Sequence, residues 1–229
     1  VASLHFAPTK NARNSLLREG ISEKNVYITG NTVVDALQVI TARQLTSSTK
    51  GILNRLPSRK RLILVTAHRR ENFGAPLQRI ITALLQLADR EDIHLVYPVH
   101  PNPSVNEPVK KALGSHRNIS LLPPLDYMTF VHLMKNAYVI LTDSGGIQEE
   151  APGLGVPVLV MRAVTERPEA IEAGTAALVG SKTEKIVSVT TRLLNDKSAH
   201  QEMAQAINPF GDGKAAQKIV EILLRQNID

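Results

Sequence analysis

The sequence of 229 residues contains no cysteine and no tryptophan, and only 3% of its residues are aromatic. Without cysteine there is no disulfide framework, no thiolate zinc site and no cysteine nucleophile. So few aromatic rings disfavour a surface on which nucleic-acid bases stack. No apolar run approaches the roughly 20 residues that span a membrane. The start shows no basic segment followed by a long apolar one, so we expect no secretory leader and a cytoplasmic protein.

The charge balance is modestly basic, with 27 Lys and Arg against 21 Asp and Glu, a formal net charge of +6. The basic residues are scattered, and the densest group, at 55–61, falls in an expected loop. This pattern favours surface solubility, with some attraction for small anionic substrates. We therefore expect neither a nucleic acid nor a membrane as a partner.

The order of apolar and amphipathic segments predicts an α/β fold, because short apolar strands alternate with amphipathic helices. Apolar runs without alternation are typical of a parallel sheet covered by helices on both faces, here Rossmann-like in its connections. We expect one domain over residues 1–229, closed by helices in 182–229. The expected strands are 26–29, 62–67, 93–99, 119–122, 138–142, 156–161 and 176–179. The expected helices are 9–20, 32–44, 76–90, 104–113, 126–136, 146–154, 166–173, 182–195 and 214–225, with a polar connection at 46–60.

Parallel sheets of this kind bind ligands beyond the carboxyl ends of their strands. The unusual residues of the sequence all fall in loops at that edge, whereas the loops of the opposite edge have an ordinary composition. These loops are 68–74, 100–103, 123–126, 143–146 and 162–167. They are the place to search for a site.

The most informative loop reads Asp-Ser-Gly-Gly-Ile-Gln-Glu-Glu over 143–150, directly after an expected strand. Gly145 and Gly146 let backbone N–H groups approach a ligand, and a helix opening there directs free N–H groups at an anion. Ser144 adds a hydroxyl donor. The alternative interpretation is a tight turn between strand and helix with acidic residues in the first helical turn.

Two carboxylates follow in that helix. Glu150 lies four residues after Gly146 and therefore on the same helix face, where it can accept hydrogen bonds from both ribose hydroxyls of a nucleotide. Glu149 lies about 100° around the helix. We expect it to stabilise the helix dipole or to be exposed.

A second loop begins with His68, followed by Arg69 and another arginine, at the carboxyl end of a strand. Such residues can donate to phosphate oxygens and handle protons. His100 ends the neighbouring strand, and two histidines on adjacent strand ends leave a metal site open as an alternative. No third ligand is well placed, so we expect no metal.

Two further loops carry candidate residues. Arg167 precedes a proline that restricts its backbone, and it can bind phosphate or a sugar hydroxyl. The alternative is a plain helix start with Thr165 as its cap. In 123–130 the backbone can read the edge of a base, with Phe130 beside it, although a core position suits Phe130 better.

Together these stretches resemble the non-hydrolysing UDP-N-acetylglucosamine 2-epimerases over nearly the whole chain and in order. The matching stretches are 5–9, 29–35, 68–74, 98–102, 143–152, 165–170 and 208–213. The family has two Rossmann-like domains in a glycosyltransferase-B-type arrangement, and this chain resembles the second, UDP-binding domain with its closing helices. The resemblance thus implies an N-terminal domain absent from this sequence, with which the start at Val1 agrees, and against which the last helix packs. One departure is Ala163-Val164, where the family has more polar residues.

The resemblance implies an isomerase of cell-surface polysaccharide biosynthesis, homodimeric at full length, that binds UDP and UDP-sugars and needs no cofactor. It interconverts UDP-N-acetylglucosamine and UDP-N-acetylmannosamine by eliminating UDP and adding it back. The implied UDP-binding residues are His68, Leu125, Phe130, Ser144, Gly145, Gly146, Glu150 and Arg167. His68 is also the implied catalytic residue, and Arg69 and His100 are implied at a second, effector site.

Three alternatives remain open from the sequence. This chain alone can be a nucleotide-binding fragment without activity. A hydrolysing epimerase has the same fold, and no residue here separates the two. The glycine and glutamate arrangement of 143–150 also occurs in glycosyltransferases, although the His-Arg-Arg-Glu-Asn loop at 68–72 argues against that reading.

Overall fold

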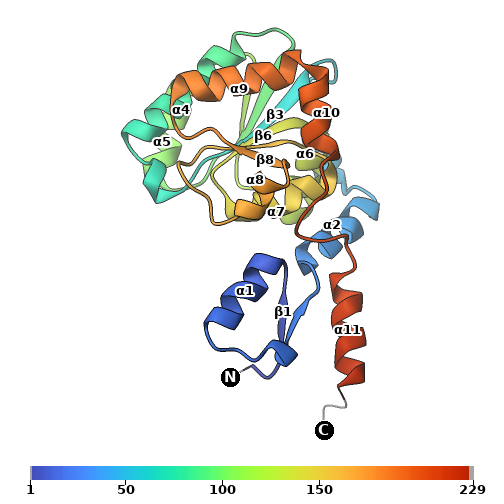
Figure 1. Cartoon of the computed structure of the whole chain (residues 1–229). Helices are drawn as coiled ribbons and strands as arrows, with labels where there is room; N and C mark the ends of the chain where they lie inside the picture. The colour runs from blue at the N-terminus through green and yellow to red at the C-terminus, as the bar shows by residue number, and fades with distance from the viewer. Residues whose placement is uncertain (1, 227–229) are drawn as a thin grey trace.

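The computed structural model describes residues 2–226 and contains a six-stranded parallel sheet with helices on both faces (Figure 1). The strand order is β5-β4-β3-β6-β7-β8. The bounds are β3 Arg61–Thr66, β4 Ile93–Pro98, β5 Ile119–Leu122, β6 Ala137–Thr142, β7 Val158–Val160 and β8 Ala176–Leu178. The expected α/β fold is thereby confirmed. Val1 and residues 227–229, which the expected domain includes, lie outside the described residues.

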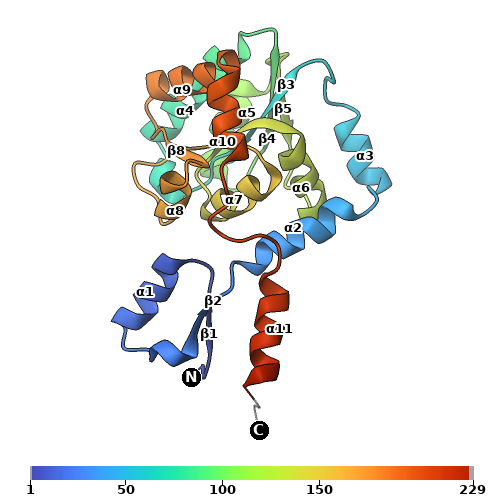
Figure 2. The ribbon, with the colours of Figure 1, turned by 45° about the vertical axis from the view of Figure 1, so that its right-hand side comes forward.

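Helices on the two faces of the sheet cover two separate apolar clusters. On one face lie α4 (Ala75–Ala88), α5 (Pro103–Leu113), α9 (Thr183–Asn195) and α10 (Lys197–Gln205), and on the other α2 (Thr32–Ala42), α3 (Ser47–Leu53), α6 (Tyr127–Asn136) and α7 (Gly145–Glu150) (Figures 1 and 2). In β3, Ile63 and Val65 face the first cluster and Leu64 the second, and all three are buried. Both faces of the strand are covered, which explains why its sequence is an unbroken apolar run.

The remaining elements are short. They are the 3₁₀ helices η1 (Glu23–Asn25), η2 (Arg70–Asn72) and η3 (Ala151–Leu154), together with α8 (Pro168–Glu172). The sharp turn after η3 ends at Gly155, which has a φ of 69° and lets the chain enter β7.

A second, smaller sheet lies apart from the first. Strands β1 (His5–Ala7) and β2 (Val26–Ile28) pair only with each other among the described residues, and α1 (Lys10–Arg18) covers them. Helix α11 (Ala215–Arg225) extends beside this unit and away from the main sheet (Figures 1 and 2). Asp35 on α2 holds its start by accepting the N–H groups of Ala215 and Ala216 at 3.1 and 2.9 Å.

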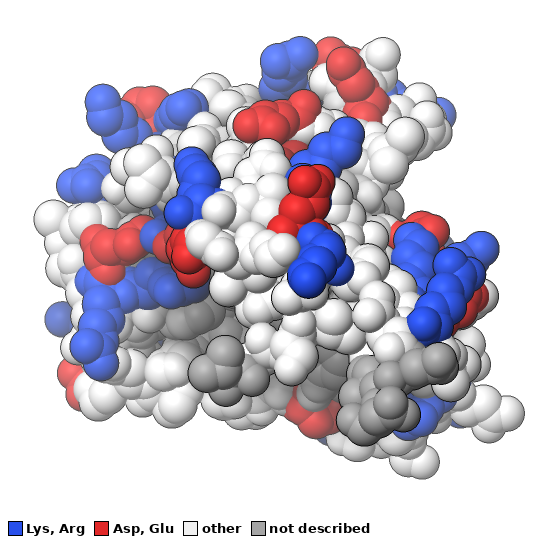
Figure 3. All heavy atoms as spheres, turned by 60° about the horizontal axis from the view of Figure 1, so that its bottom comes forward, with Lys and Arg blue, Asp and Glu red and all other residues white. Residues whose placement is uncertain are grey.

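This lower part of the molecule leaves large apolar side chains in solvent. Ile28 on β2 and Val220, Leu223 and Leu224 on α11 are exposed, Leu224 to 76%. On the face shown in Figure 3, basic and acidic side chains lie in mixed groups separated by uncharged areas.

The sequence-based prediction missed two helices. The polar connection expected at 46–60 contains α3, which Thr46 caps and which Thr49 anchors through a buried hydroxyl bond of 2.8 Å to Thr129 on α6. Helix α10 follows α9 after the single residue Asp196. Its His200 ring stacks on Tyr138 with ring centroids 3.8 Å apart. Both helices contain few apolar residues, so the pattern of apolar positions did not predict them. Contacts with distant residues, such as Thr129 and Tyr138, hold them in place.

Candidate functional site

A cavity of about 310 Å³ opens at the carboxyl edge of the main sheet, between the ends of β3, β4 and β6 and the start of α6. Residues from four sequence-distant loops line it. They include His68, His100, Tyr127, Phe130, Ser144, Gly146 and Glu150. The expected edge of the sheet is therefore where the candidate residues meet.

His68 follows β3 and forms one wall of this cavity, with its side chain 37% exposed. The rings of His68 and His100 stack with centroids 5.5 Å apart and an angle of 15° between their planes. Burial lowers the pKa of His68 below its ordinary value. The nearby Asp143 carboxylate opposes that change, whereas His100 and Arg69 add to it.

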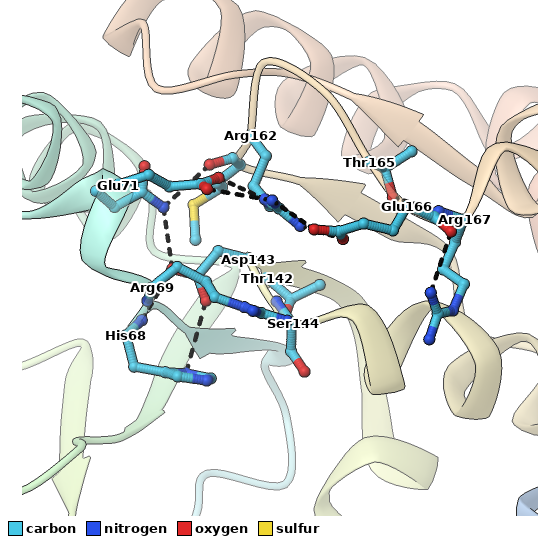
Figure 4. Close-up of polar contacts among 12 residues, drawn as sticks. His68, Arg69, Glu71, Thr142, Asp143, Ser144, Arg162, Thr165, Glu166 and Arg167 are labelled. Atoms are coloured by element: carbon cyan, nitrogen blue, oxygen red, sulfur yellow. Dashed lines mark hydrogen bonds and ion pairs between the residues drawn. The ribbon is translucent and has the colours of Figure 1, made fainter.

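Asp143, the residue directly after β6, organises the loop that carries His68. Its carboxylate is fully buried, and Oδ2 accepts hydrogen bonds from the backbone N–H groups of His68 and Arg69 and from the side chain of Asn72, at 2.9, 2.8 and 2.9 Å. Two loops that follow adjacent strands are thus joined by one carboxylate (Figure 4). The sequence predicted the loop and not this role of Asp143.

Helix α7 begins at Gly145, with Ser144 at the N-cap position and no side-chain cap bond. It is six residues long, so its attraction for an anion comes from its first N–H groups rather than from a long helix dipole. A Cβ on Gly146 would lie 3.6 Å from Glu150 Oε1 and 3.9 Å from Ser144 Oγ. Glu150 therefore shares one side of the helix with Gly146, as predicted, and Ser144 lies on that side as well.

Glu150 points into the cavity and accepts a hydrogen bond of 3.2 Å from the hydroxyl of Tyr127. Burial raises the pKa of Glu150, which the Tyr127 hydrogen bond partly counteracts. Burial, followed by the charge of Glu150, raises the pKa of Tyr127 to about 12. The pair lines the same cavity as His68, and the sequence did not indicate Tyr127.

The expectation for Glu149 is wrong, since its carboxylate is neither exposed nor a partner of the helix end. It is 7% exposed and pairs with Arg167, while Asn31, 118 positions earlier, donates to its other oxygen. Gly145 lies on the same side of α7, and a Cβ there would be 3.8 Å from Arg69 Nη2 and 4.0 Å from Arg167 Cζ. The 100° step between neighbouring helix residues separates this side from that of Glu150.

Arg167 therefore lines a different cavity, of about 970 Å³, together with Glu149 and residues of α1. It is also the residue at the N-cap of α8, so Thr165 is not the cap that the alternative reading placed there. Thr165 instead donates to Gln148 at 2.6 Å and accepts the N–H of Arg167 at 3.0 Å. These bonds fix the loop despite the less polar Ala163-Val164.

A further ion-pair group, unforeseen from the sequence, braces two of the site loops. Arg162, only 6% exposed, binds Glu71 of the His68 loop and Glu166 of its own loop (Figure 4). The hydrogen bonds from Arg162 lower the pKa of Glu166 to about 2. The bonds between Arg162 and Glu71 hold the loops after β3 and β7 together.

The comparisons with known proteins identify the family. The profile described as UDP-N-acetylglucosamine 2-epimerase matches residues 1–224. This chain belongs to that family. The UDP-N-acetylglucosamine 2-epimerase of Yersinia pestis is 50% identical over 234 aligned residues, an alignment that includes 100% of this chain and 62% of the relative.

Solved structures of the family agree. The UDP-GlcNAc 2-epimerase of Neisseria meningitidis bound to UDP-GlcNAc is 44% identical with a TM-score of 0.90, covering 98% of this chain and 62% of that one. The Staphylococcus aureus protein MnaA solved with UDP is 45% identical with a TM-score of 0.90, covering 100% and 62%. This epimerase-family chain thus spans less than two thirds of the length of these relatives.

Of the remaining candidate residues of this epimerase-family chain, Phe130 and His100 line the smaller cavity, whereas Leu125 and Arg69 do not. Leu125 and Phe130 are partly buried and pack against the apolar cluster under α2 and α6. Arg69 lies near Gly145, and His100 lines the same cavity as His68 rather than a separate one. Within residues 2–226, no cluster of three His, Asp or Glu side chains is arranged to hold a metal ion, and no helix is long and apolar enough to cross a membrane.

Proposed function

We propose that this chain is the UDP-binding part of an enzyme that interconverts UDP-N-acetylglucosamine and UDP-N-acetylmannosamine. The main observation in support of this proposal is that one cavity at the carboxyl edge of the sheet is lined by His68, Ser144, Gly146 and Glu150. They supply an imidazole, a hydroxyl, accessible backbone N–H groups and a carboxylate, which are groups that recognise a nucleoside diphosphate. The UDP and UDP-GlcNAc complexes of the two relatives support this assignment.

Each wall of the cavity has a role in this proposal. The Glu150 carboxylate accepts hydrogen bonds from the two ribose hydroxyls, and Ser144 and the glycine N–H groups bind the diphosphate. Phe130 and Leu125 lie at the uracil. Arg167 contributes its charge near the start of α7, where its Cζ would lie 4.0 Å from a Cβ on Gly145.

The reaction proposed is elimination followed by addition. C2 of the sugar loses its proton, the C1–O bond breaks, and its electron pair leaves with UDP, giving 2-acetamidoglucal. UDP then adds back to C1 while C2 takes a proton on the opposite face. His68 is the catalytic residue on this chain, donating to the departing diphosphate and stabilising its charge. We assign none of the residues of this chain to the C2 proton.

The exposed apolar side chains on β2 and α11 favour the proposal that a further part of the enzyme packs on these two elements. Ile28, Val220 and Leu224 form surfaces on β2 and α11 that main-sheet residues do not cover. We propose that the additional length of the relatives packs on these elements and completes the active site. The homodimer, the effector site at Arg69 and His100 and the cytoplasmic location stay predictions.

Calorimetric titration of this chain with UDP tests the binding proposal. We expect binding to the unmodified chain and at least about tenfold weaker binding in Glu150→Ala and His68→Ala, because each loses a charged hydrogen bond. Glu202→Ala, at an exposed position on α10, is the control and should bind as the unmodified chain does. A folded chain that does not bind UDP, or equal binding in all variants, would contradict the proposal.

Product analysis separates the alternatives. With UDP-N-acetylglucosamine, we expect binding without turnover from this chain alone and UDP-N-acetylmannosamine from the full-length protein. Free N-acetylmannosamine as the product indicates a hydrolysing epimerase. Transfer of the sugar to an added acceptor indicates a glycosyltransferase.

A further inference from the structure

One oxygen of the Asp143 carboxylate has no hydrogen-bond partner among residues 2–226. Oδ2 accepts three hydrogen bonds, whereas Oδ1 is buried and accepts none. An unpaired buried acceptor costs about 1–3 kcal/mol. Nδ1 of His68 lies 3.6 Å from Oδ1, within ion-pair distance (Figure 4).

Asp143 contacts both the backbone and the side chain of His68. Oδ2 binds the N–H of His68 itself, so the carboxylate holds both the main chain and the ring edge of the same residue. A small rotation of the His68 ring brings Nδ1 within hydrogen-bond distance of Oδ1. With Nδ1 turned toward Asp143, Nε2 is the ring nitrogen that remains for the cavity.

We propose that Asp143 is the positioning residue of His68: Oδ1 accepts the Nδ1–H and thereby presents Nε2 to the diphosphate. This inference rests on the proposed function, in which His68 donates to the departing UDP. In the imidazolium form both ring N–H groups then have a partner, Asp143 on one side and a phosphate oxygen on the other. Asp143 does not touch the substrate and acts through His68.

The charges around His68 agree with this role. His100 stacks on the ring from the end of β4, Arg69 follows it on the same loop, and Glu150 on α7 lines the same cavity. Burial lowers the pKa of His68, and His100 and Arg69 lower it further, while Asp143 opposes all three. Without Asp143 the protonated ring would therefore form only at a lower pH.

Asp143→Asn is the informative substitution because the two oxygens of Asp143 have unequal partners. Three N–H donors surround the Oδ2 position, so the amide oxygen of asparagine must take that position. The amide NH₂ group then replaces Oδ1 and faces Nδ1 of His68. A donor facing Nδ1 forces the neutral ring into the Nε2–H tautomer and destabilises the imidazolium.

The test is long-range ¹H–¹⁵N NMR of the histidine rings of this chain between pH 5 and 9, with the His68 signal assigned by its loss in His68→Gln. We expect an Nδ1–H tautomer for neutral His68 in the unmodified chain. In Asp143→Asn we expect an Nε2–H tautomer and a His68 pKa lower by about one unit or more. In the control His100→Gln, which removes the stacked ring and leaves the contact between Asp143 and His68 in place, the tautomer should stay Nδ1–H.

An Nε2–H tautomer in the unmodified chain would overturn the inference, even if Asp143→Asn fails to fold. A folded Asp143→Asn chain with unchanged tautomer and pKa would overturn it as well. UDP titrations at pH 6 and pH 8 separate this result from the proposed function. At pH 6 the unmodified chain should bind UDP about tenfold more tightly than Asp143→Asn does. At pH 8 the difference in UDP affinity between the two proteins should be smaller. Absence of UDP binding to the unmodified chain contradicts the proposed function, while the tautomer still decides the role of Asp143.

Discussion

Glu149 and Glu150 are adjacent in sequence, yet α7 directs their carboxylates into two different cavities. Glu149 pairs with Arg167 beside the cavity of about 970 Å³, and Glu150 meets Tyr127 in the cavity of about 310 Å³. The first carboxylate has charged and amide partners within the protein. Among the described residues the second has the neutral Tyr127 hydroxyl as its side-chain donor, and burial disfavours its ionisation.

Glu150→Gln is expected to stabilise the free chain at neutral pH. Burial raises the pKa of Glu150 in the folded state, so the stability that its protonated form contributes below the ordinary pKa is lost as the pH rises through the raised value. Glutamine carries no charge at any pH. Thermal unfolding should show a melting temperature higher by a few degrees at pH 7 and little gain at pH 4. An equal gain at both pH values would contradict this account, and Glu202→Gln is the exposed control.

The affinity for UDP should fall in acid as Glu150 becomes protonated. Only the ionised carboxylate offers acceptors to both ribose hydroxyls, and its raised pKa places the loss above the range of an ordinary glutamate. Titrations from pH 7 down to pH 4 should show this decrease in the unmodified chain. In Glu150→Gln the affinity should be about tenfold lower at pH 7 and should not fall toward pH 4, because protonation of His68 then strengthens the binding of the diphosphate. A decrease of the same size in both proteins would assign the effect to another group.

Arg167→Ala should destabilise the fold as well as weaken UDP binding. It leaves the buried Glu149 carboxylate with Asn31 as its side-chain donor, which we expect to cost about 1.5–3 kcal/mol of unfolding free energy. Urea denaturation measures this change. The control is Arg18→Ala, an exposed arginine of the same cavity, for which we expect a change within about 0.5 kcal/mol. Similar effects of the two substitutions would contradict a structural role of Arg167.

Gly146→Ala should separate folding from binding. A Cβ at this position makes only ordinary contacts, at 3.6 Å from Glu150 Oε1, so the stability should stay within about 1 kcal/mol. The methyl group points to the side of the helix where the proposed diphosphate approaches, and UDP affinity should fall at least about tenfold. Gly51→Ala, whose Cβ meets nothing within 4 Å, controls for a helical glycine replacement away from the site. Unchanged UDP affinity in Gly146→Ala would remove the glycine from the binding site.

Gly30→Ala should be strongly destabilising because two chain segments cross there. Gly30 has a φ of +86°, and a Cβ would lie 3.1 Å from Gly211 Cα and 3.2 Å from Phe210 O, both backbone atoms. We expect a loss of about 2 kcal/mol or more from strain and contact together. Gly20→Ala has nearly the same φ, +87°, and open space around its Cβ, so it measures the backbone part alone. Equal losses in chemical denaturation would show that the crossing itself tolerates a methyl group.

The alternation of apolar runs and amphipathic helices was enough to predict the main sheet and its covered faces. Burial on both sides of a strand leaves a direct mark on composition, as in Ile63, Leu64 and Val65. The same pattern located the candidate site, because the carboxyl ends of parallel strands meet at one edge. The loops that begin at His68 and Asp143 could therefore be placed at the same edge of the sheet from the sequence alone.

The structure alone decided which polar partners these residues have. Glu149 binds Asn31, 118 positions away, and Asp143 binds the main chain of His68, 75 positions away. Local periodicity states which side of a helix faces the protein, and it contains no information about which distant loop packs against that side. The same limit applies to α3 and α10, because Thr49 and His200 contact Thr129 and Tyr138, which lie far away in the sequence.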